Sequence, residues 1–170
     1  MPRYAALLRG VSPMNCKMSA LQQALERSGF TGVVTVLSSG NVVFDARSAP
    51  LAKLEARVEA ATRTHLGRAF ATIVRSVESL GALLASEPFA PFGPKPGEKK
   101  VVTFFKAPPP AVRLPVALGK ARIVDLGPAH ALTLYAPEDA GPVFMQLIEK
   151  TFGKEVTTRT WDTVAKVAAK

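Results

Sequence analysis

Cysteine and histidine are scarce in this chain of 170 residues, and their scarcity narrows the chemistry open to it. The one cysteine, Cys16, has no second cysteine with which to form an internal disulfide, which is consistent with a reducing compartment. His65 and His130 lie far apart in the sequence, and neither has a metal-ligand neighbour at helical or Cys-x-x-Cys spacing. We therefore expect no metal site.

The common nucleotide and hydrolase motifs are also missing. The chain contains no G-x-x-x-x-G-K-[ST], no G-x-G-x-x-G and no G-x-S-x-G. A phosphate loop, a dinucleotide fold and a hydrolase elbow thus have no local support, and we expect no cofactor. An enzyme of unknown reaction stays open as an alternative, with Cys16 or Asp162 as its candidate reactive group.

No hydrophobic run is long enough for a membrane. Only five apolar residues separate Arg3 from Arg9, too few for a signal peptide or a membrane span. Hydrophobic residues make up 48% of the chain and charged residues 21%, which is typical of a soluble globular protein with a real core. We expect a cytoplasmic protein without a membrane partner.

Positive charge is abundant, with a formal net charge of +9. Lysines and arginines that neutralise phosphates supply sequence-independent affinity, so a nucleic-acid-binding module is one alternative function. The excess positive charge is spread over both halves of the chain. One group of lysines comes nearest to a cluster, and we interpret it as part of a solvent-exposed loop and the start of a strand. That cluster consists of Lys95, Lys99, Lys100 and Lys106.

The first half predicts the order strand, helix, strand, strand, helix, strand. β-Branched runs on both sides of a glycine-bearing turn indicate a hairpin, and apolar residues at helical spacing indicate the helices. The predicted strands are 4–9, 33–37, 41–45 and 70–75, and the predicted helices are 18–28 and one whose first turn holds Pro50.

The second half repeats this order less clearly, and a proline-interrupted segment at 112–118 stands where its first helix would be. The fold class that we predict is α+β, a tandem pair of ferredoxin-like (βαββαβ) units with an extra C-terminal helix. The units are 1–85 and 100–170, joined by a proline-rich linker at 86–99. The other predicted elements are strands 100–106, 122–126 and 130–135, a helix at 141–152, a short strand near Val156 and a terminal helix from Trp161.

The predicted strands are apolar on both faces, as in 4–8, 33–37 and 101–105. A sheet with one solvated face would alternate apolar and polar residues. The second face is therefore covered by the other half, by the extra helices or by a partner subunit, which leaves a homodimer open. It also argues against an RNA-recognition sheet, which would present stacking aromatics.

Three polar islands interrupt the apolar segments: the end of the first strand, the hairpin turn at 37–41 and the segment 157–163. A threonine-capped helix start leaves amide donors and a positive dipole end beside a guanidinium, an arrangement that binds anions. Our first hypothesis is that the islands line a pocket between the units for a small phosphate- or carboxylate-bearing ligand. The candidate ligand-binding residues are Arg9, Ser39, Asn41, Thr158, Arg159 and Trp161.

Each island also has a structural alternative. Arg9 could pair with a nearby carboxylate such as Asp45. Glycine and asparagine at 40–41 are what a tight hairpin turn requires. The third island could be a well-capped terminal helix whose Trp161 packs into the core.

Segments 6–11, 37–44, 74–76 and 157–166 resemble the bacterial family called domain of unknown function 1697, in order and at family-like spacing. The resemblance implies a pair of ferredoxin-like units; the activity of that family is not established, so it assigns no catalytic residue. The chain departs from the family pattern at 12–14, where Ser-Pro-Met replaces a glycine-rich stretch, and at Ser38, Thr160 and Asp162. Asp162 adds a negative charge beside the expected anion site.

Overall fold

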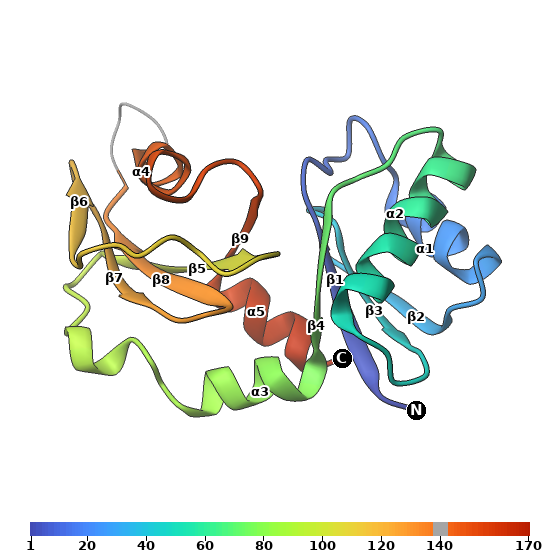
Figure 1. Ribbon diagram of the computed structural model, residues 1–170, viewed down its shortest axis with the longest axis horizontal. Coiled ribbons are helices and arrows are strands. Elements are labelled where there is room, and N and C mark those ends of the chain that lie inside the picture. The colour runs from blue at the N-terminus through green and yellow to red at the C-terminus, as the bar shows by residue number, and fades with distance from the viewer. Residues whose placement is uncertain (138–142) are drawn as a thin grey trace. The chain divides into compact units, whose positions relative to one another are not determined.

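The computed structural model describes residues 1–137 and 143–170, and it has a mixed α+β fold with two antiparallel sheets (Figure 1). This confirms the predicted α+β class. The chain forms two compact units, one of residues 1–85 with 164–170 and the other of residues 86–163. The proline-rich stretch 86–99 is thus grouped with the second unit, and the end of the terminal helix is grouped with the first.

The first unit contains a four-stranded sheet in the order β2-β3-β1-β4, with every neighbouring pair antiparallel. Its first six elements follow the predicted order, and α3 then begins directly after β4 in a stretch where the sequence predicts no helix. The elements are β1 (Arg3–Leu8), α1 (Met18–Arg27), β2 (Thr31–Val36), β3 (Asn41–Asp45), α2 (Leu51–Leu66), β4 (Thr72–Ser76) and α3 (Val77–Ala85).

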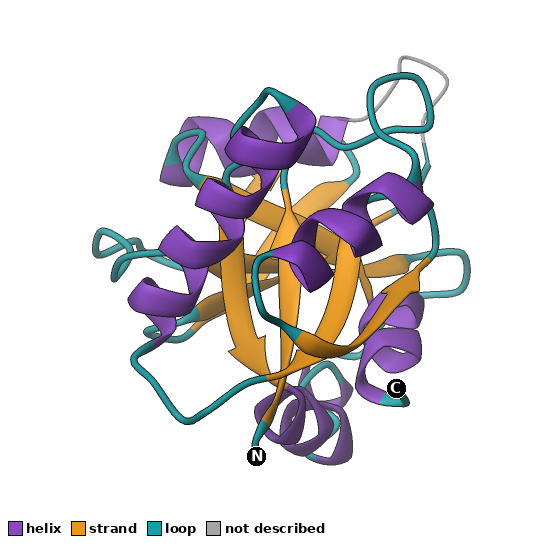
Figure 2. Cartoon of the chain, turned by 90° about the vertical axis from the view of Figure 1, so that its right-hand side faces the viewer, coloured by secondary structure: helices purple, strands orange, loops and turns teal. Residues whose placement is uncertain are grey.

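Helices α1 and α2 lie side by side over one face of this sheet (Figures 1 and 2). Leu21 and Leu25 of α1 and Leu54 of α2 are fully buried, and they pack in one core with alternate residues of the strands. Strand residues on the other face, such as Ala5 and Leu7, are buried as well. The strands are therefore apolar on both faces because both faces are covered, and α3 lies against β1 and β4.

The second unit contains a five-stranded antiparallel sheet in the order β6-β7-β8-β5-β9. Helix α5 begins directly after β9 and continues into residues that are grouped with the first unit. The elements are the short 3-10 helix η1 (Ala90–Phe92), β5 (Lys99–Phe105), β6 (Val116–Leu118), β7 (Ala121–Leu126), β8 (His130–Tyr135), α4 (Val143–Phe152), β9 (Val156–Thr160) and α5 (Trp161–Ala168).

The prediction of a helix near residues 112–118 is wrong. The described chain has strand β6 there, which pairs with β7 at the edge of the sheet. Prolines at 108–110 and at 115 remove the backbone donors that a helix needs, whereas the short edge strand begins only after Pro115. The predicted start of the next helix at Gly141 lies outside the described residues.

Helix α4 lies over the sheet of the second unit (Figure 1). Its buried Leu147 and Ile148 belong to the core beneath it. Two ring pairs extend this layer: Tyr135 stacks on Phe144 with 4.2 Å between centroids, and Phe105 meets Phe152 edge-on at 4.9 Å. Each buried leucine or isoleucine stabilises the fold by about 1.5–3 kcal/mol. Among the described residues, none of the helices has the length and hydropathy that a membrane crossing needs.

Candidate functional site

The first two polar islands come together at one end of β1. The backbone N–H of Leu8 donates to the carbonyl of Gly40, and the N–H of Arg9 donates to the carbonyl of Ala71, each at 2.8 Å. The half-buried Arg9 therefore follows a strand whose end is held next to the hairpin turn.

The side chain of Asn41 stabilises this turn. Its side chain is fully buried, and its Nδ2 donates to the carbonyl of Val36 and to Oγ of Ser39, each at 3.0 Å. Gly40 has φ +88°, and a Cβ there would lie 2.8 Å from Cβ of Val11. The contacts of Asn41 and Gly40 thus build the hairpin, and a ligand-binding role for Ser39 and Asn41 stays a prediction.

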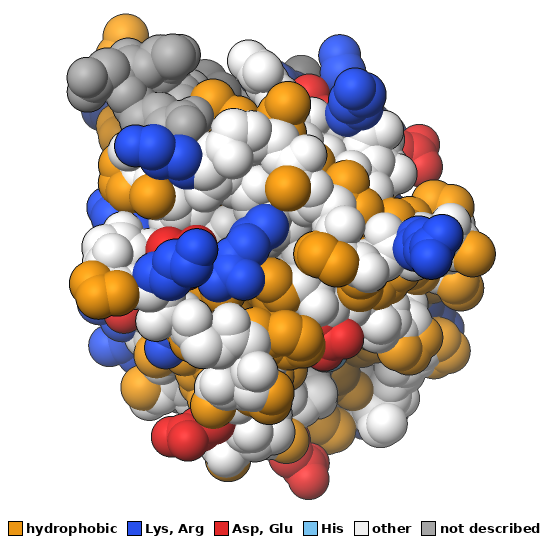
Figure 3. Space-filling view, turned by 90° about the vertical axis from the view of Figure 1, so that its left-hand side faces the viewer, with side chains coloured by type: hydrophobic (Ala, Val, Ile, Leu, Met, Phe, Trp, Pro, Cys, Tyr) orange, Lys and Arg blue, Asp and Glu red, His pale blue; other side chains and the backbone are white. Residues whose placement is uncertain are grey.

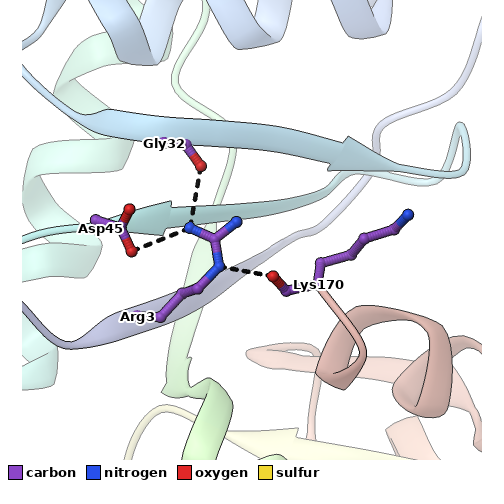
Figure 4. Close-up of polar contacts among 4 residues, drawn as sticks. All are labelled: Arg3, Gly32, Asp45 and Lys170. Carbon is purple, nitrogen blue, oxygen red and sulfur yellow. Dashed lines mark hydrogen bonds and ion pairs between the residues drawn. The ribbon is translucent and has the colours of Figure 1, made fainter.

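Asp45, the carboxylate offered as a partner for Arg9, lies at the opposite end of β1. It accepts a hydrogen bond from Nη1 of Arg3 at 3.0 Å, so the predicted pairing with Arg9 is wrong (Figure 4). Arg3 also donates from Nη1 to the carbonyl of Gly32 and from Nε to the carbonyl of Lys170. Gly32 has φ +57°, a left-handed conformation that favours glycine, and a Cβ there would clash with the Asp45 carboxylate. Through these hydrogen bonds, Arg3 connects the last residue of the chain to β1.

The third island runs along β9 into α5. Oγ1 of Thr158 contacts Sδ of Met145 on α4 at 3.5 Å, and Nη1 of Arg159 donates to the carbonyl of Thr158 at 2.8 Å. Burial lowers the pKa of the Arg159 guanidinium to about 10, because the charged form loses hydration. Oγ1 of Thr160 accepts from the N–H of Thr163 at 3.3 Å and so caps α5.

Trp161, the first residue of α5, is half-buried, and its ring meets Phe89 edge-on with 5.1 Å between centroids. It also borders a cavity of about 390 Å³, a volume within the range of small-molecule sites. The cavity forms where the start of β5 lies between the ends of β8 and β9: Lys99 is opposite Tyr135, and Val101 is opposite Thr160. The lining residues are Glu98, Lys99, Lys100, Tyr135, Thr160, Trp161 and Asp162.

Two lysines dominate the charge around this cavity. Nζ of Lys100 lies 5.8 Å from the centroid of the Phe89 ring, within cation–π distance, and Lys99 is exposed. The carboxylate of Glu98 accepts two hydrogen bonds from Arg122, at 2.9 and 3.3 Å, which lower the pKa of Glu98 and balance its charge. Because Arg122 neutralises Glu98, the two ammonium groups are opposed only by the exposed carboxylate of Asp162 within this lining.

The structure brings one of the six predicted ligand-binding residues, Trp161, to the cavity, together with residues that were not predicted to bind a ligand. The lysine run at 99–100 is visible in the sequence, but its proximity to Tyr135 and Thr160 depends on strand pairing. Arg9, Ser39 and Asn41 belong to the first unit, whereas Thr158, Arg159 and Trp161 belong to the second.

Cys16, a candidate nucleophile, is buried. Its thiol contacts the carbonyl of Lys17 at 3.6 Å, and burial raises its pKa. A raised pKa leaves less of the reactive thiolate at neutral pH. Neither observation favours nucleophilic chemistry at this position.

The comparisons with known proteins concern the family and the fold. A model of the family described as "Protein of unknown function (DUF1697)" matches residues 1–121, more than half of the chain. The chain belongs to this family. The resemblance inferred from the sequence is thus confirmed, while no curated protein matches the chain.

A solved structure described as that of conserved bacterial protein SP0830 from Streptococcus pneumoniae is similar to this DUF1697 chain, with a TM-score of 0.71. The likeness covers 99% of this chain and 97% of the other. Because the two sequences are only 20% identical, it concerns the fold alone. The DUF1697 match includes Glu98, Lys99 and Lys100, whereas the other cavity-lining residues follow the matched range.

Proposed function

We propose that this protein binds a small ligand bearing a phosphate or carboxylate group in the cavity at the start of β5. The observation that carries the proposal is the pair of neighbouring lysines beside Trp161 at the rim of a cavity of about 390 Å³. Ammonium groups attract oxyanions as point charges, and an indole face or edge contacts the apolar part of a ligand. The ligand needs no cofactor or metal in this proposal.

The nucleic-acid alternative has less support from the surface. On the face drawn in Figure 3, two groups of Lys and Arg side chains adjoin, and uncharged and hydrophobic side chains separate the others, so they form no continuous stripe. Nucleic-acid binders commonly gather such residues into a stripe or patch that follows the phosphates. A small anion needs only the local pair of lysines.

We also propose that both units are ferredoxin-like, with β6 replacing the first helix of the second unit. The strand orders β4-β1-β3-β2 and β9-β5-β8-β7 support this. In both sheets the last, first, third and second strands of a βαββαβ unit follow one another in the same spatial order. In the second unit β6 adds a fifth strand beside β7.

Calorimetric titration with orthophosphate, citrate and AMP tests the ligand proposal. For any probe that binds the wild type, Lys99→Gln and Lys100→Gln should each raise the dissociation constant by about tenfold, the effect of losing one charged contact. The matched control is Lys53→Gln, which removes the same charge from an exposed position on α2 in the first unit and should leave binding unchanged. The proposal fails if none of the probes binds at millimolar concentration, or if all three variants behave alike.

A further inference from the structure

Two buried hydroxyl groups in the second unit call for an explanation. Oγ1 of Thr103 on β5 and Oγ1 of Thr133 on β8 have no hydrogen-bond partner among the described residues, and both side chains are fully buried. Nearly all buried polar groups in folded proteins are hydrogen-bonded, because each loses hydration on burial. Both hydroxyls, on the neighbouring strands β5 and β8, can therefore accept or donate a further hydrogen bond.

Strand register puts both hydroxyls on one face of the sheet. Val101 is opposite Thr133, and Thr103 is opposite Ala131, so all four side chains point the same way. Ala131 packs in the core under α4, which identifies the face. The same face continues onto β9, where Thr158 is opposite Thr103 and Thr160 is opposite Val101.

This face joins the threonines to the cavity. Thr160 and Tyr135 line the cavity, whereas Thr103 and Thr133 are buried farther along the same face, behind the lining residues. Thr133 lies two residues before Tyr135 on β8, and it is separated from Thr160 only by Val101 of the strand between them. With strands about 4.8 Å apart, the backbones at Thr133 and Thr160 are about 10 Å apart, and the side chain of Val101 stands between theirs on this face.

We infer that Thr103 and Thr133 form the inner end of the ligand site and hydrogen-bond a neutral hydroxyl-bearing part of the ligand. The inference rests on the proposed function, with the anionic group held by Lys99 and Lys100. The inner end is neutral because its polar groups are hydroxyls and its neighbours are apolar, and a buried charge there would lack a counterion. The ligand class is therefore a phosphorylated or carboxylated polyol, such as a sugar phosphate.

Glucose 6-phosphate and hexyl phosphate are the matched probes, since both carry six carbons and a phosphate but only the sugar carries hydroxyls. We expect the wild-type protein to bind glucose 6-phosphate at least tenfold more tightly. Thr103→Val with Thr133→Val should abolish this preference and leave hexyl phosphate binding unchanged, whereas Lys99→Gln should weaken both. If the double variant prefers glucose 6-phosphate over hexyl phosphate as strongly as the wild type does, the inference alone is overturned. If neither phosphate binds the wild type, the proposed function is overturned with it.

Melting temperatures in phosphate-free buffer provide a second readout. Replacing an unpartnered buried hydroxyl by a methyl removes its desolvation cost, so Thr103→Val and Thr133→Val should each raise the melting temperature by about 2–4 °C. Thr72→Val is the control, because its buried hydroxyl donates to the carbonyl of Phe70 at 2.9 Å and its loss should lower the melting temperature. If the Thr103 and Thr133 variants melt lower, as the control does, their hydroxyls have protein partners and the inference is wrong.

Discussion

Arg75 and Arg159 make the same hydrogen bond in the two units. In each, Nη1 donates to the carbonyl of the preceding residue, Val74 or Thr158, at 2.8 Å. Arg75 lies on β4, which pairs with β1, and Arg159 lies on β9, which pairs with β5. Burial lowers the pKa of both guanidinium groups, and the nearby Glu55 carboxylate partly opposes this at Arg75.

The likeness extends past the arginines. Segments 75–80 and 159–164 share the pattern arginine, hydroxyl residue, apolar residue, acidic residue, hydroxyl residue, apolar residue. In both, the strand runs directly into a helix, and the hydroxyl of Ser76 or Thr160 accepts from the N–H three residues later. The two junctions are therefore built alike, with each hydroxyl serving as the cap that its helix start requires.

The different surroundings of the two arginines predict different costs of replacement. Arg75→Met should lower the free energy of unfolding by about 1–3 kcal/mol, because it removes a hydrogen bond and the cation near the buried carboxylate of Glu55. Arg159→Met should cost less, because removing a desolvated charge offsets the lost hydrogen bond. Urea denaturation measures both, and an equal or larger loss at Arg159 would contradict this account.

Asn41 is predicted to stabilise the hairpin turn. Asn41→Ala should lower the free energy of unfolding by about 1–3 kcal/mol, because the carbonyl of Val36 loses a buried donor. Ser39→Ala is the control, since Ser39 is exposed and its removal leaves the bond to Val36 in place. A smaller loss for Asn41→Ala than for Ser39→Ala in urea denaturation would show that the turn does not depend on this bond.

Glu98 should make stability sensitive to acid. Arg122 lowers the pKa of Glu98 below its ordinary value of 4.5, so the folded state favours the charged carboxylate. Its contribution is complete above that value and is lost as the pH falls through the lower pKa of the folded state. Glu98→Gln should therefore flatten the decline of melting temperature below about pH 4.5. Glu26→Gln, which removes the same charge from an exposed position on α1, should leave that decline unchanged.

Cys16 should react slowly with thiol reagents while the protein is folded. Its side chain is 7% exposed, and burial raises the pKa of the thiol. We expect labelling by a chromogenic disulfide at pH 8 to be at least about tenfold slower in buffer than in denaturing urea. Equal rates would mean that Cys16 is accessible and would restore its candidacy as a nucleophile.

The sequence predicts much of the fold because local signals mark most elements. β-Branched runs around the 38–40 turn indicate β2 and β3, and helical spacing of apolar residues indicates α1 and α2. The segment at 112–118 is different: Pro115 argues against a long helix, yet only the partner strand β7 makes its last three residues a strand. Arg3 could not be assigned either, because its partners come from three distant segments.

The candidate site is less predictable for the same reason. Lys99, Tyr135 and Thr160 lie on three strands, and they approach one another only through the register of β5 with β8 and β9. No spacing within a single segment encodes that register. Trp161 could be selected because it starts a capped helix, a feature that is local in sequence.

The fluorescence of Trp161, the only tryptophan of the chain, tests the cavity proposal most directly. Titration with orthophosphate and with citrate at constant ionic strength should change its emission saturably in the wild type and in Lys53→Gln. The change should need about tenfold more ligand in Lys99→Gln and in Lys100→Gln, because each removes one of the two cations at the cavity. Emission that stays constant with both anions, or that changes identically in all four proteins, would contradict a ligand site beside Trp161.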